Sequence, residues 1–138
     1  MEYNITLNLK KEDLETLLKL IYLGNWVANV NREEERMIKK FEDLKNQILS
    51  MIENKDIKEE YENLKSDNEI INIIEEYNEI VFWDLLITRL AERDMVLEYG
   101  EEGLKNLSNE EYKKTNLEYQ KKYYQEFFEN GLWNLIIR

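Results

Sequence analysis

The complete absence of proline is the feature that most constrains how this chain folds. Proline interrupts helices and glycine weakens them, yet the 138 residues include no proline and only four glycines. Stretches with apolar residues at helical spacing can therefore run for many turns. We predict a mainly α fold, a helical bundle of about five helices, formed by a single domain over residues 1–138.

The longest apolar helical run, Asn78–Tyr99, is expected to be the central helix. At 100° per residue its apolar side chains share one broad stripe, so most of its surface should be buried. Asp94 projects into this stripe, and a carboxylate there needs a hydrogen-bond donor. The candidate donors, in order, are Asn25, Arg32, Arg89 and a tyrosine. We expect Asp94 and Asn25, which faces the core from an earlier helix, to be buried polar residues with structural roles. The stripe comprises Ile80, Trp83, Ile87, Leu90 and Leu97.

Capping signals and apolar spacing place the other helices. Residues 11–30 and 56–64 have helical apolar patterns, and the second of these brings Ile57, Tyr61 and Leu64 together. Three capping boxes predict helix starts: Asn31 with Glu34, Ser66 with Glu69, and Ser108 with Glu111. The first of these helices should run from about residue 32 to 54, and the last to about residue 130, ending at a glycine. The second, over 70–77, either continues into the central helix or bends near Asn78.

The last helix is expected to pack on two sides, because it carries two apolar faces. One face has Tyr112, Tyr119, Tyr123 and Phe127, and the other has Leu117, Tyr124 and Phe128.

Both ends of the chain show the alternation of a half-buried strand. Tyr3–Leu9 alternates apolar and polar residues, and so does Leu132–Arg138. A lone strand leaves its backbone groups unpaired, so the two segments should pair as a small two-stranded β ribbon.

The charge pattern points to a basic partner. The net charge of −11 opposes direct binding to nucleic acid, whose phosphates would be repelled. Residues 53–79 hold ten acids and three lysines, a net charge of −7 within one segment. Nine of these acids form the candidate partner-binding surface: Asp56, Glu59, Glu60, Glu62, Asp67, Glu69, Glu75, Glu76 and Glu79.

Missing residue types narrow the chemistry. There is no cysteine, which excludes disulfides and thiolate metal sites, and no histidine, the commonest general base. The best catalytic candidate is an acid set similar to the magnesium-binding motifs of all-α nucleotide pyrophosphatases: Glu75, Glu76, Glu79, Glu92 and Asp94. Its spacing fails, because Glu92 and Asp94 lie about 200° apart on a helix. We therefore expect no catalytic residue, no metal and no cofactor.

Nothing in the sequence predicts a signal peptide or a membrane span, since the apolar segment 17–30 is interrupted by Lys19, Gly24 and Asn25. With no cysteine either, we expect a cytoplasmic protein that binds neither membranes nor nucleic acid. The oligomeric state is left open.

Four sequence blocks resemble an uncharacterised family of small acidic bacterial and phage proteins. They are LGNWV at 23–27, YNEIVFWDLL at 77–86, RLAERD at 89–94 and ENG at 129–131. The family has no established activity, so the resemblance implies no catalytic residue. Lys10, where a capping Ser or Thr is expected, and the segment 50–65 depart from the family pattern.

The favoured hypothesis is a non-enzymatic protein-binding or regulatory module that engages a basic protein surface. A sharper version is an inhibitor that imitates the charge of nucleic acid, as anti-defence proteins do. The alternatives are a magnesium-dependent all-α hydrolase that uses carboxylates and a structural protein.

Overall fold

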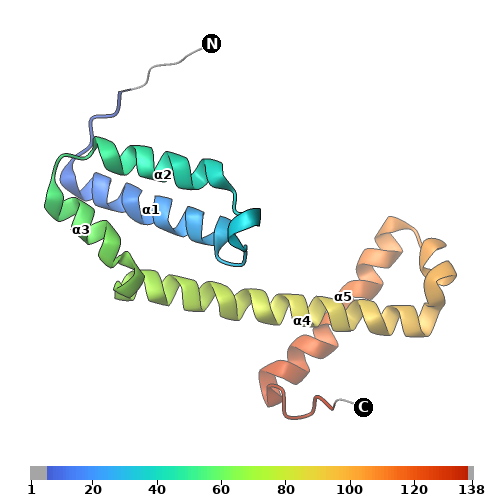
Figure 1. The fold of residues 1–138 in the computed structure, drawn as a ribbon. Helices are drawn as coiled ribbons and strands as arrows, with labels where there is room; N and C mark the ends of the chain where they lie inside the picture. The colour runs from blue at the N-terminus through green and yellow to red at the C-terminus, as the bar shows by residue number, and fades with distance from the viewer. Residues whose placement is uncertain (1–5, 137–138) are drawn as a thin grey trace. The chain divides into compact units, whose positions relative to one another are not determined.

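The computed structural model describes residues 6–136 and is mainly helical, which confirms the mainly α part of the predicted fold class (Figure 1). Residue contacts divide the chain into two compact units, Met1–Ile74 and Glu75–Arg138, called unit 1 and unit 2 below. The single domain expected from the sequence stays a prediction.

Unit 1 is built on helix α1 (Lys11–Asn29), which contacts both α2 (Lys39–Met51) and α3 (Lys55–Asn63). A short 3-10 turn, η1 (Glu34–Arg36), precedes α2, and a second, η2 (Leu64–Ser66), follows α3. The first turns of α4 (Asn68–Lys105) complete the unit. Figure 1 shows α1 and α2 lying side by side.

The core of unit 1 lies where α1, α3 and the start of α4 meet. Leu18 of α1 packs with Ile57, Tyr61 and Leu64, as the spacing of these three residues predicted, and with Ile70. Burying side chains of this size stabilises a fold by about 1.5–3 kcal/mol each. The core therefore fixes which face of α3 points outward.

Two predicted helix starts in unit 1 are wrong. Asn31 and Glu34 do not open a long helix, because α2 begins only at Lys39. The Asn29 side chain instead accepts a hydrogen bond from the backbone N–H of Ile38 (2.8 Å), which holds the preceding segment outside the helix. Similarly, the start of α4 is capped by Asp67, whose Oδ1 accepts from the Ile70 N–H (3.1 Å), rather than by Ser66.

In unit 2, α4 and α5 (Asn109–Asn130) form a helical hairpin in which α5 crosses α4 (Figure 1). The turn between them begins at Gly100, whose φ of 68° and ψ of 165° break the helical geometry of α4. The predicted capping box of Ser108 and Glu111 is confirmed at the start of α5, and Gly131, with φ 56°, follows its last residue.

The expectation that α4 is buried on most of its surface is wrong. Within unit 2 only one stripe is buried, formed by Ile87, Ala91 and Met95, whereas Ile80 is 55% and Leu97 76% exposed. The small side chain of Ala91, fully buried, lies at the centre of this stripe. In unit 2 this helix packs on a single helical neighbour, so a narrow stripe is all that the hairpin covers.

The predicted β ribbon is not seen in residues 6–136. Residues 6–10 are irregular and exposed, and residues 131–134 form turns. Backbone hydrogen bonds from Trp133 N–H to Asn130 O (3.2 Å) and from Leu135 N–H to Leu132 O (3.0 Å) curl this segment. They use donors that a strand would direct to its partner. Residues 1–5 and 137–138 of the predicted strands lie outside the described residues.

Candidate functional site

The nine candidate acids are divided between the two units. Asp56, Glu59, Glu60, Glu62, Asp67 and Glu69 belong to unit 1, and the other three belong to unit 2. All nine are exposed except Asp67, which is half-buried because it caps α4. The structure therefore brings six of them together in one compact unit and places the rest in the other.

The acids of α3 point outward because the opposite face of this helix is anchored in the core. Ile57 and Tyr61 are buried, and Asn54 caps the helix by accepting from the Asp56 N–H (2.8 Å). At 100° per residue, Asp56 and Glu60 share one flank of α3. Glu62 lies on the other flank, between Lys55 and Lys58.

An acidic hollow of about 480 Å³ lies beside the first of these flanks, between α1, α3 and the residues just before α4. Leu18, Tyr61 and Leu64 form its apolar lining. Three carboxylates contribute to the wall, from Glu15, Glu60 and Asp67, against one ammonium group, that of Lys19. We call this the acidic hollow.

Two lysines of α1 partly neutralise the acids around the hollow. Lys11 Nζ lies 3.3 Å from Glu15 Oε1 and 3.9 Å from Glu60 Oε1. Lys19 Nζ lies 4.0 Å from Asp67 Oδ2 and donates a hydrogen bond to Glu69. The pKa of each lysine is raised, mainly by its hydrogen bond to Glu15 or Glu69. Among the described residues, Asp56, Glu59 and Glu62 form no salt bridge, so their charge is available to a partner.

The acids proposed for magnesium do not converge. Glu79 accepts a hydrogen bond from Trp83 Nε1 (2.6 Å), and Glu92 pairs with Arg89 (3.1 Å). Within residues 6–136, no three acidic side chains are placed to hold a metal ion. The hydrolase alternative thus has no supporting constellation in this part of the chain.

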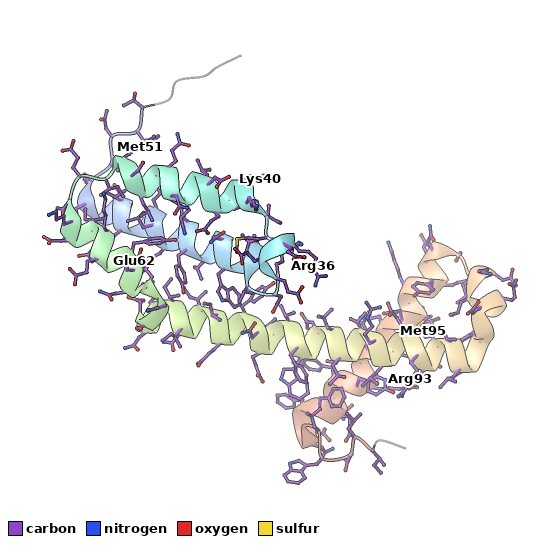
Figure 2. The ribbon with its side chains drawn as sticks, in the orientation of Figure 1. Arg36, Lys40, Met51, Glu62, Arg93 and Met95 are labelled. Atoms are coloured by element: carbon purple, nitrogen blue, oxygen red, sulfur yellow. The ribbon has the colours of Figure 1, made fainter. Side chains whose placement is uncertain are left out.

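Asp94 is half-buried, and its partner is the last of the four predicted donors, a tyrosine. Tyr123 Oη donates to Asp94 Oδ2, and Arg93 Nε donates to Asp94 Oδ1 (2.8 Å; Figure 2 labels Arg93). Burial raises the pKa of Asp94, but the hydrogen bonds from Tyr123 and Arg93 and the arginine charge outweigh it and lower the pKa below its ordinary value. Arg32 and Arg89 bind Ala28 and Glu92 instead. Asp94 therefore joins α4 to α5.

Asn25 is also half-buried and belongs to a polar chain between α1 and α2. Its Nδ2 donates to Glu42 (2.9 Å), and its Oδ1 accepts from Asn29 Nδ2 (2.8 Å). Hydrogen bonds from Lys45 and Asn25 lower the pKa of Glu42 despite its burial. Sequence reasoning missed Asn29, which is more buried than Asn25. Its position four residues after Asn25, on the same helix face, was the available signal.

Comparison of the chain with protein-family models, curated proteins and solved structures gave no match. The resemblance to a family of small acidic proteins stays a prediction. None of the helices in the described residues has the length and apolar character needed to cross a membrane.

Proposed function

We propose that this protein is a non-enzymatic binding module that engages a basic surface of another protein through unit 1. The acidic hollow carries this proposal, because it combines three carboxylates with an apolar lining in a concave site. A lysine or arginine side chain has the matching character. Its aliphatic stem can cover Leu18 and Leu64 while its charged head reaches the carboxylates.

The acids next to the hollow can attract a basic partner over a longer distance. Asp56 and Glu59 are exposed on α3 and form no salt bridge with described residues, so their charge can attract an external cation. Such a charge distribution speeds association with a basic partner more than it increases final affinity. A protein that normally binds nucleic acid has a basic surface. The sharper form of the proposal is therefore an inhibitor that imitates nucleic-acid charge.

Charge reversal on α3 tests the proposal. Replacing Glu59, Glu60 and Glu62 together by lysine should lower the affinity for a Lys/Arg-rich peptide at least tenfold, since it turns an attractive surface into a repulsive one. Fluorescence anisotropy of a labelled peptide measures the change. Thermal unfolding of the same variant checks that the fold survives the loss of the pair between Lys11 and Glu60.

A matched control lies in the same unit. Glu33, Glu34 and Glu35 are exposed and stand beside Arg32 and Arg36, so reversing these three acids changes the net charge equally outside the hollow. The control variant should keep most of the parent affinity. Equal losses in both triple variants would show that only the total charge matters and would refute a site in unit 1.

A further inference from the structure

The second apolar face of α5 has no partner within unit 2. Tyr119, Tyr123 and Phe127 contact α4, whereas Phe128 is 81% exposed and Tyr124 64% exposed. Tyr124 and Phe128 stack on each other with their ring centroids 6.3 Å apart. This side of the hairpin is therefore an ordered aromatic surface.

A continuous furrow follows this face along the line where α4 and α5 meet. Three adjoining hollows form it, of about 340, 440 and 400 Å³, and neighbouring hollows share lining residues such as Leu117 and Tyr124. Trp83, Tyr124 and Phe128 line the end nearest the C-terminus of α5, which is mostly apolar. Glu92 and Lys113 line the opposite end.

Acidic and basic side chains line opposite walls of the furrow. Every acid that lines it comes from α4, namely Glu79, Asp84 and Glu92, and both lysines, Lys113 and Lys121, come from α5. Lys121 shares a hollow with Asp84, and Lys113 shares one with Glu92. Among the described residues, Asp84, Lys113 and Lys121 form no salt bridge, so each remains available to an external group.

We propose that this furrow is the interface of a symmetric homodimer, in which the α4–α5 hairpins of two copies pack face to face. A two-fold axis that runs parallel to the furrow keeps each residue of the second copy at the same position along the furrow. It also places the α5 wall of one copy opposite the α4 wall of the other. Asp84 then meets the partner's Lys121, and Glu92 meets the partner's Lys113. The face is thus complementary to itself, which a C2 interface requires.

The size of the hairpin suits this arrangement. With 22 residues, α5 is about 33 Å long, enough for several turns of contact between the two copies. The dimer would bury Tyr124 and Phe128 at the mostly apolar end of the furrow, where their aromatic side chains contribute a large buried area. It would also give α5 the second packing side that its two apolar faces predict.

Sedimentation equilibrium of the full chain over a range of concentrations tests the proposal. The parent should dimerise, and Phe128→Ser should raise the dimer dissociation constant at least tenfold without a matching loss of thermal stability at low concentration. Leu97→Ser removes an apolar side chain of similar exposure (76%) that does not line the furrow, and it should leave dimerisation unchanged.

A charge exchange separates self-pairing from binding to another helix. Asp84→Lys and Lys121→Glu should each weaken the dimer about tenfold or more, because each places like charges opposite one another twice per dimer. The double variant, Asp84→Lys with Lys121→Glu, should restore the parent dissociation constant. A parent that stays monomeric at every concentration, or a double variant no better than the single ones, would overturn the proposed interface.

Discussion

Tyrosine hydroxyls of α5 bind two acids of α4 where these helices meet. Tyr123 donates to Asp94, and Tyr119 donates to Glu98. The hydrogen bond to Glu98, followed by burial, raises the pKa of Tyr119 to about 12. The phenols therefore stay protonated over the neutral range, so both remain hydrogen-bond donors.

Asp94 should make stability depend on pH in the acid range. Its folded-state pKa lies below the ordinary value of 3.8, so the unfolded chain binds the proton first as the pH falls. The stabilisation is complete well above pH 3.8 and is lost as the pH falls through the lower, folded-state pKa. Asp94→Asn should lower the free energy of unfolding by about 1–2 kcal/mol at neutral pH, with the difference shrinking in acid. Urea unfolding at a series of pH values measures it.

A suitable control for Asp94 is an exposed acid of α4 whose side chain makes no hydrogen bond. Glu98 is unsuitable because it accepts the Tyr119 hydrogen bond. Glu101 is exposed and makes no hydrogen bond among the described residues, so Glu101→Gln should change stability little at any pH. An Asp94 variant with the same flat pH profile as this control would show that Asp94 does not join the two helices.

The helices show which local signals the sequence carries reliably. Ser108 and Glu111 form the capping box that their spacing predicted. Asn31 and Glu34 have the same spacing, yet α2 begins only after Ile38, whose N–H donates a hydrogen bond to the Asn29 side chain. The strand prediction failed for a similar reason, since local turns bind backbone groups that a ribbon would need. Local patterns predict helices well and their exact starts poorly.

Two glycines with different backbone conformations test how the local backbone geometry of α1 and α4 affects stability. Gly24 lies inside α1, and an added Cβ there meets no atom within 4 Å. Gly24→Ala should therefore stabilise the protein by about 0.5–1 kcal/mol, because alanine is the better helix former. Gly100, at φ 68° and ψ 165°, has a conformation that other residues rarely adopt. Gly100→Ala should destabilise by about 1–3 kcal/mol.

Thermal unfolding of both variants, with the parent alongside, provides the measurement. The diagnostic result is that the two substitutions change the stability in opposite directions. If Gly100→Ala were as stable as the parent, the turn between α4 and α5 would not need a positive φ at this position.

At the scale of the whole molecule, the sequence predicted the acidic segment but not how much of its charge is already neutralised. Lys19 lies 50 residues before Glu69, and no local pattern indicates that the two side chains meet. Their contact depends on the packing of α1 against the start of α4, which is a tertiary property. The hollow itself has the same origin, since Glu15 comes from α1 and Glu60 from α3. The sequence thus indicated the candidate acids, whereas tertiary packing decides which of them line the acidic hollow.

The salt dependence of binding is a direct test of whether unit 1 engages a basic surface. If unit 1 engages a basic surface, the affinity for a Lys/Arg-rich peptide should fall steeply as salt reduces the Debye length below about 8 Å. The reversal variant of Glu59, Glu60 and Glu62 should show a flatter dependence than the Glu33–Glu35 control, while the melting temperature of the parent changes little over the same range. Parent binding that is insensitive to salt, or the same salt dependence of affinity for both variants, would contradict binding of a basic surface by unit 1.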